Sequence, residues 1–170
     1  GPSCSGKSKI ATRYLADHPD FEKLPSYTTK DPTALVANQW YTYISLEEFR
    51  KMCDSGELVT STMYAGQGYG SKWCDIERIL GSGKRVMTTM DICGAMALKT
   101  YYKNVTTIYI KREKRALMAS ILQKNSTIEA KVNRLASIDY EVQNASLCDH
   151  IINFEEYDDA VAQLKETLGN

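Results

Sequence analysis

The chain has 170 residues, of which 43% are hydrophobic and 25% are charged, a composition typical of one soluble globular domain. Lysine and arginine together number 21, as do aspartate and glutamate, so the net charge is zero. Proteins that bind nucleic acid or a membrane surface usually carry a basic excess, and no apolar run reaches the about 18 residues that cross a bilayer. We therefore expect neither nucleic acid nor a membrane as a partner.

The first half of the chain alternates short extended and helical patterns. The expected helices occupy residues 7–17, 46–54 and 71–80, and the expected strands residues 21–30, 40–44 and 58–64. Ser45 stands three positions before Glu48, the capping-box pattern that opens the second helix. Gly66, Gly68 and Gly70 together predict a turn.

The second half repeats strands and helices in alternation. The expected strands occupy residues 84–90, 105–110 and 150–153, and the expected helices residues 91–99, 115–123, 127–147 and 157–168. This order predicts an α/β/α three-layer domain around a parallel sheet. The strands at 40–44 and 58–64 are joined by one short helix, which predicts a small inserted antiparallel lobe.

The first eight residues, GPSCSGKS, match the phosphate-binding pattern G-x-x-x-x-G-K-[ST] and lead directly into a helical pattern. Small residues let successive backbone N–H groups surround an anion, and the helix N-terminus adds partial positive charge. Lys7 is expected to reach the phosphates of ATP, and Ser8 offers a hydroxyl to Mg²⁺. The expected nucleotide-binding residues are Gly1, Ser3, Cys4, Ser5, Gly6, Lys7 and Ser8.

A strand normally precedes such a loop, so we expect a first strand upstream of Gly1.

The five cysteines form no C-x-x-C pair, and with only two histidines they give no zinc-type spacing. These features predict a chain of the reducing cytoplasm. The alternative for the N-terminal motif is a simple Gly/Ser turn that caps a helix.

Several further segments, in order, resemble the guanylate kinase family. Residues 26–30 (SYTTK) are similar to its S-x-T-T-R segment, and 64–71 (YAGQGYGS) to its Y-x-G-N-Y-Y-G-T segment. Residues 90–99 (MDICGAMALK) and 128–135 (IEAKVNRL) resemble its I-D-x-Q-G-A and I-x-x-R-L elements. The resemblance implies a P-loop NTPase fold in one domain over 1–170, with an acceptor-binding lobe at about 30–75 and a lid at about 112–133.

The resemblance also implies roles for single residues. Lys7, Asp91 and Arg134 match catalytic positions, and Ser8 matches the Mg²⁺ position. The residues matched to the acceptor site are Ser26, Lys30, Tyr41, Thr60, Tyr69, Ser71 and Asp91. Asp91 has a plain alternative as a helix N-cap, and Arg134 as an exposed arginine on an amphipathic helix. Tyr41 and Tyr69, taken singly in a chain with 11 tyrosines, could serve only in packing.

The chain also departs from the family pattern. Lys30 and Thr33 stand at or near arginine positions, and lysine lacks the planar fork of a guanidinium. Thr60 replaces a glutamate that accepts hydrogen bonds from guanine, and such acceptors can discriminate by about 10⁴-fold. Thr89 replaces an aspartate. In the lid, Ser120 and Lys124 stand where the family has arginines, and Arg112, Lys114 or Arg115 could replace them.

The expected activity is phosphoryl transfer from ATP, with Mg²⁺, to a nucleoside monophosphate, GMP in the family pattern. Two alternatives stay open. One is a kinase of this fold acting on another monophosphate or a sugar phosphate, and the other is a nucleotide-binding module without turnover. We expect a monomer or a homodimer whose partner is a nucleotide substrate.

Overall fold

The computed structural model describes residues 1–31, 40–64 and 66–169. The chain divides into two compact units, the first made of Gly1–Asp17 and Asn104–Asn170 and the second of His18–Lys103. The expected acceptor lobe falls within the second unit and the expected lid within the first. Thr33 lies outside the described residues. Among the described residues, no helix is long and apolar enough to span a membrane.

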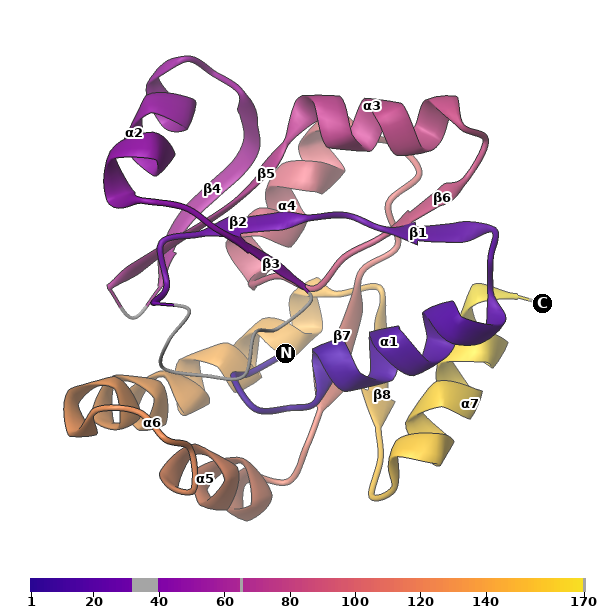
Figure 1. The fold of residues 1–170 in the computed structure, drawn as a ribbon. Helices are drawn as coiled ribbons and strands as arrows, with labels where there is room; N and C mark the ends of the chain where they lie inside the picture. Colours follow the sequence, from indigo (N-terminus) through magenta and orange to yellow (C-terminus); the bar gives the residue numbers. More distant parts are fainter. Residues whose placement is uncertain (32–39, 65, 170) are drawn as a thin grey trace. The chain divides into compact units, whose positions relative to one another are not determined.

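The first unit is built on two parallel strands covered by helices (Figure 1). Its elements are α1 (Lys7–Asp17), β7 (Ile108–Lys111), α5 (Lys114–Leu122), α6 (Ile128–Gln143), the 3₁₀ helix η2 (Asn144–Leu147), β8 (His150–Asn153) and α7 (Tyr157–Leu168). Ile10 and Tyr14 of α1 are each 1% exposed, because their spacing of four residues turns them to one face. Ion pairs from Arg13 to Asp158 and from Lys165 to Asp17 join α1 to α7.

Helices α5 and α6 have a small apolar core of their own. Leu117, Ile121 and Ile138 are at most 1% exposed and pack together. The partly buried side chains of Cys4 and Leu135 pack against this cluster. A residue of the N-terminal loop is therefore part of the same apolar core as the two helices.

The second unit contains a four-stranded sheet and a parallel pair. Its elements are β1 (Phe21–Lys23), β2 (Ser26–Thr28), β3 (Tyr41–Tyr43), α2 (Leu46–Asp54), β4 (Leu58–Tyr64), β5 (Gln67–Lys72), α3 (Trp73–Gly81), β6 (Arg85–Met87) and α4 (Ile92–Tyr101). The sheet order is β3-β2-β5-β4, and β1 pairs in parallel with β6. The predicted capping box of α2 is present, since Ser45 and Glu48 bond each other's backbone N–H.

The turn predicted at Gly66–Gly70 is wrong beyond Gly66, because residues 67–72 form strand β5. Glycine suits this strand because of its neighbours. A Cβ on Gly68 would lie 2.8 Å from Cε1 of Phe49, and a Cβ on Gly70 would lie 2.8 Å from the Thr60 carbonyl oxygen. Here glycine allows close packing and does not end the strand.

The predicted antiparallel lobe is only partly correct. Strand β4 pairs antiparallel with β5, but β3 pairs in parallel with β2 and does not neighbour β4. The parallel strands predicted at 84–90 and 105–110 are shorter, at Arg85–Met87 and Ile108–Lys111. The helix predicted over 127–147 ends at Gln143 and continues as η2.

Candidate active site

The N-terminal loop holds backbone conformations that lead into α1. Cys4 and Gly6 have φ angles of 68° and 95°, both in the region that favours glycine. A Cβ on Gly6 would also lie 2.7 Å from Cε1 of Tyr157. At position 6, both the backbone angle and the available space therefore require glycine.

The loop lies against β7 and holds Lys7 close to its own backbone. A Cβ on Gly1 would collide with the carbonyl oxygen of Ile110 in β7. The Nζ of Lys7 donates to the carbonyl oxygens of Gly1 and Pro2, the latter at 2.8 Å. The amine thus lies across the loop, where incoming phosphate oxygens could replace carbonyl oxygens as its acceptors.

Two buried polar side chains of the first unit have donors without acceptors among the described residues. The Ser5 side chain is fully buried, and its Oγ has no hydrogen-bond partner there. Arg134 of α6 is 9% exposed, and its Nε and Nη1 are likewise without partners within that part of the chain. Leaving two donors of a buried guanidinium without acceptors is costly, so these donors fit an anionic ligand. Arg134 is thus not the exposed arginine of the simpler interpretation.

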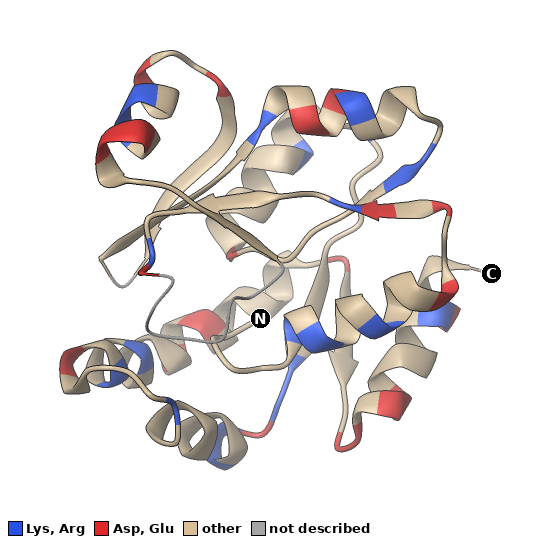
Figure 2. Ribbon diagram, viewed as in Figure 1, with Lys and Arg blue, Asp and Glu red and all other residues tan. Residues whose placement is uncertain are grey.

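Basic residues gather along α1 and at the carboxyl end of β7 (Figure 2). The Nζ of Lys9 lies 3.8 Å from the centre of the Tyr157 ring, and the guanidinium of Arg13 lies 5.7 Å from it. Tyr157 therefore contacts both the loop and the basic face of α1. Tyr157 is not among the residues expected from the sequence, although its place at the start of α7, a few residues after the parallel strand β8, is where ligand-contacting residues gather in α/β folds.

The residues expected on the donor side all lie in the first unit. Ser3 and Cys4 are half-buried, and the Ser3 Oγ lies 3.8 Å from the Cys4 Sγ. Ser8 is half-buried in the first turn of α1. The helix N-terminus and Lys7 suit a phosphate, and the Ser8 hydroxyl is an oxygen ligand of the kind that a phosphate-bound Mg²⁺ accepts.

Four residues expected on the acceptor side come together in the second unit, three in its sheet and Lys30 just after β2. Ser26 of β2 is the register partner of Tyr41 in β3. The rings of Tyr41 and Tyr69 lie 5.8 Å apart, and the Nζ of Lys30 lies 5.9 Å from the centre of the Tyr41 ring. Two phenol groups and an ammonium at this spacing can hold a phosphate with hydrogen bonds and charge.

Thr60 and Ser71 form a second acceptor-side pair. They are register partners in β4 and β5, next to a β-bulge between Leu58 and Thr60, and they are 7% and 2% exposed. The strand pairing thus brings two short hydroxyl side chains together in a buried position. These groups can donate or accept a hydrogen bond but carry no charge.

Asp91 serves as the N-cap of α4, since its Oδ1 accepts a hydrogen bond from the Gly94 backbone N–H at 2.9 Å. The capping alternative is therefore real. The cap engages one carboxylate oxygen, Oδ1. It fixes the side chain of Asp91 at the end of the segment that follows β6.

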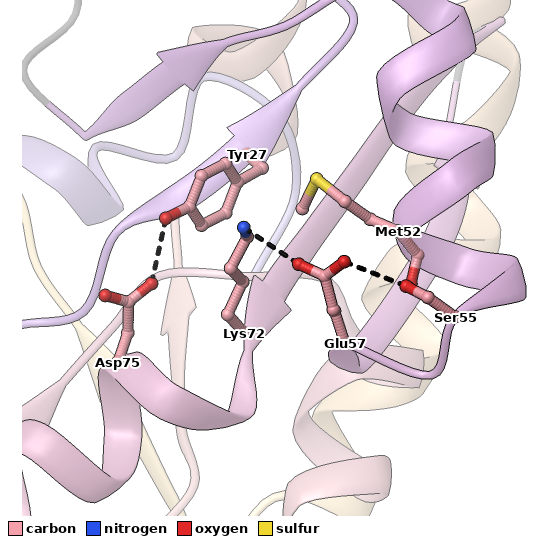
Figure 3. Close-up of polar contacts among 6 residues, drawn as sticks. All are labelled: Tyr27, Met52, Ser55, Glu57, Lys72 and Asp75. Atoms are coloured by element: carbon pink, nitrogen blue, oxygen red, sulfur yellow. Dashed lines mark hydrogen bonds and ion pairs between the residues drawn. The ribbon is translucent and has the colours of Figure 1, made fainter.

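Glu57 belongs to a polar network in the second unit (Figure 3). Its carboxylate accepts hydrogen bonds from Lys72 Nζ at 3.1 Å and Ser55 Oγ at 2.9 Å, and these bonds lower its pKa. Beside it, Tyr27 donates to Asp75 at 3.0 Å, and burial followed by that bond raises the pKa of Tyr27 to about 12. Lys72 and Ser55 thus hold the Glu57 carboxylate. Glu57 therefore does not supply a carboxylate in place of the one that Thr60 lacks.

Comparison with known proteins gives one consistent result. The sequence profile described as guanylate kinase matches residues 1–170. A guanylate kinase from Cupriavidus metallidurans is 29% identical over 98% of this chain and 79% of its own length, and one from Geobacter metallireducens is 28% identical over 98% and 84%. The crystal structure of guanylate kinase from Anaplasma phagocytophilum superposes with a TM-score of 0.76 at 19% identity, covering 95% of this chain and 80% of that one. The predicted fold class is confirmed by this structural similarity.

Proposed function

The chain belongs to the guanylate kinase family, and from this premise we propose that it transfers the γ-phosphoryl group of ATP to GMP, releasing ADP and GDP. The observation that carries the proposal is the intact phosphate-binding loop folded onto α1 in a chain that the family profile matches throughout. This reaction needs no covalent intermediate, so the residues act by positioning and by charge stabilisation.

On the donor side, the loop from Gly1 to Gly6 would bind the phosphates of ATP through its backbone N–H groups. Lys7 would exchange its carbonyl acceptors for phosphate oxygens. The Ser8 hydroxyl, with the oxygens of ATP itself, would hold Mg²⁺, which neutralises charge on the phosphates. No group of three His, Cys, Asp or Glu side chains that could hold a metal occurs within residues 1–31, 40–64 and 66–169, which fits a cation held mainly by the nucleotide.

On the acceptor side, Tyr41, Tyr69 and Lys30 would hold the monophosphate, as their mutual distances allow. The base would face Ser26, Ser71 and Thr60, with Asp91 at the end of the neighbouring segment. Arg134 and Lys7 would stabilise the charge on the transferred group. Guanidinium groups in this role contribute on the order of 10³-fold or more to the rate of phosphoryl transfer.

The neutral hydroxyl of Thr60 supports a second candidate. A pocket without the carboxylate discriminates less strongly for guanine, so another nucleoside monophosphate or a sugar phosphate could be the better acceptor. A third candidate is a nucleotide-binding module without turnover.

A panel of acceptors with ATP and Mg²⁺ separates these candidates, with ADP release as the measurement. We expect GMP to be phosphorylated most efficiently. Turnover with a different acceptor alone would favour the second candidate. ATP binding without turnover of any acceptor would favour the third.

We also propose that the enzyme acts in the cytoplasm as a monomer or a homodimer. Sedimentation at micromolar concentration would distinguish the two assembly states. A larger assembly would contradict the proposal.

A further inference from the structure

A second arginine of the first unit reaches the phosphate-binding loop. Arg112 follows β7, and its Nη1 donates to the main-chain carbonyl oxygen of Cys4 and to the Oγ of Ser120, each at 3.1 Å. The side chain is half-buried, and the structure records no ion pair between it and a carboxylate of the described residues. Its guanidinium is thus hydrogen-bonded to two neutral oxygens, and no carboxylate of the described residues forms an ion pair with it.

The residue that Arg112 contacts has a backbone conformation that must be held from outside. Cys4 has a φ of 68°, a left-handed angle that costs a non-glycine residue about 1–2 kcal/mol. Its side chain packs against the α5–α6 core, and the next peptide N–H, that of Ser5, donates to the Pro2 carbonyl at 3.2 Å. Arg112 supplies the third restraint, at the carbonyl.

Fixing this carbonyl has a direct consequence for the loop. In a trans peptide, the C=O and the following N–H point in opposite directions. When Arg112 holds the Cys4 carbonyl on one side, the Ser5 N–H must point to the other side, across the loop toward Pro2. To bind a phosphate oxygen, that N–H would exchange the Pro2 carbonyl for it, as Lys7 would exchange its own carbonyl acceptors.

Ser120 explains why the guanidinium can occupy this place. Ser120 stands where the family pattern has an arginine, and here its hydroxyl accepts a hydrogen bond from Arg112. An arginine at position 120 would place a second guanidinium against the first, and two like charges at this distance repel. One guanidinium fits the place, and in this chain residue 112 provides it.

We propose that Arg112 is a positioning residue of the ATP site, which orients the Cys4–Ser5 peptide for phosphate binding from the place that Ser120 leaves free. The inference depends on one part of the proposed function, namely that the N-terminal loop binds ATP. If Arg112 has this role, its replacement weakens the binding of ATP and leaves the binding of GMP unchanged.

Calorimetry of ATP and GMP binding to single variants tests the proposal. Arg112→Ala is expected to raise the Kd for ATP about tenfold, while the Kd for GMP and the thermal midpoint change little. Arg112→Lys keeps the charge but not the planar fork and is expected to recover only part of the affinity. Lys111→Ala removes a positive charge from an exposed side chain of the same basic stretch, and it should bind ATP like the parent protein.

The exchange variant tests the relation to position 120. Arg112→Ser combined with Ser120→Arg should bind ATP more tightly than Arg112→Ser alone, whereas Ser120→Arg alone should weaken ATP binding. If Arg112→Ala does not fold, Arg112→Gln carries the same expectation. An ATP Kd within twofold of the parent in the folded Arg112 variant, or equal losses for ATP and GMP, would overturn the proposal.

The outcome for Arg112 is separate from the outcome for the enzyme activity. If the parent protein binds ATP but phosphorylates no monophosphate, the proposed reaction fails while the comparison of ATP affinities still decides the role of Arg112. If the parent protein binds no ATP, both proposals fail.

Discussion

Gly6 shows how a single position of the loop combines a backbone requirement with a packing requirement. Its φ of 95° is unfavourable for any side chain, and Tyr157 fills the space that a Cβ would need. We expect Gly6→Ala to destabilise the fold by more than the about 1–2 kcal/mol that a left-handed backbone costs by itself, and to abolish measurable ATP binding. Chemical denaturation and calorimetry measure the two effects.

Gly56 provides the matched control for this prediction. Its φ is 71°, but a Cβ there would meet nothing within 4 Å. Gly56→Ala should therefore show the backbone cost alone and leave ATP binding unchanged. Equal destabilisation by both variants would show that Tyr157 adds no restraint at position 6.

Thr60 is the position at which acceptor specificity is most open to change. We expect Thr60→Glu to tighten GMP binding by about tenfold or more, because a carboxylate would accept charge-assisted hydrogen bonds from guanine, each contributing about 1.5–3 kcal/mol. Ser61→Glu is the control, because Ser61 is exposed and alternation places it on the opposite face of β4. An unchanged Kd for GMP in Thr60→Glu would show that this residue does not line the base pocket.

Between elements, Glu22 joins three parts of the second unit. From β1 it accepts hydrogen bonds from Arg78 of α3 at 2.7 Å and from Lys84, just before β6, at 3.1 Å. The bonds from Arg78 and then Lys84 lower the pKa of Glu22. A lowered pKa in the folded state stabilises the fold above the ordinary glutamate pKa of about 4.5, and this contribution disappears as the pH falls through the lowered value.

We therefore expect Glu22→Gln to lower the unfolding free energy at pH 7 by up to about 1 kcal/mol, since the ion pairs are partly exposed. The difference from the parent protein should vanish in strong acid, where both side chains are neutral. Urea unfolding at pH 7 and pH 3 measures it, with the exposed Glu77→Gln of α3 as control. A difference that stays constant between the two pH values would contradict the role of the charge.

Elements differ in how far the local sequence specifies them. The start of α2 was predicted because Ser45 and Glu48 lie three residues apart and bond each other. Strand β5 was not predicted, because its glycines fit neighbours that are distant in sequence, such as Phe49. The parallel pairing of β2 with β3 likewise depends on which strands meet in space, and local patterns do not contain that information.

At the scale of the whole molecule, the expected donor and acceptor residues divide between the two units. The loop motif is contiguous in sequence and could be predicted as a set. The burial of Arg134 on α6 and the contact of Tyr157 with Gly6 could not, since both depend on tertiary packing within the first unit. Family resemblance named Arg134, and its unpartnered buried donors now support an anion-binding role.

Ligand binding should stabilise the whole protein if the loop binds ATP. At an ATP concentration of 100 times Kd, the expected gain is about 2.7 kcal/mol, which raises the thermal midpoint by several degrees. Lys7→Ala should abolish both this shift and turnover while keeping the midpoint of the free protein. Lys103→Ala, an exposed lysine of the second unit, should behave like the parent protein. Activity in Lys7→Ala would refute the assignment of the loop.

The packing of Cys4 into the apolar core of α5 and α6 gives the protein an internal chemical reporter. Maleimide reagents should label the exposed Cys53, Cys74 and Cys93 quickly and the half-buried Cys4 only when the helices separate. The labelling rate at Cys4, read by peptide mass spectrometry against the three fast thiols, would therefore measure how often this core opens. Bound ATP should slow that rate if it keeps the loop and the helices together.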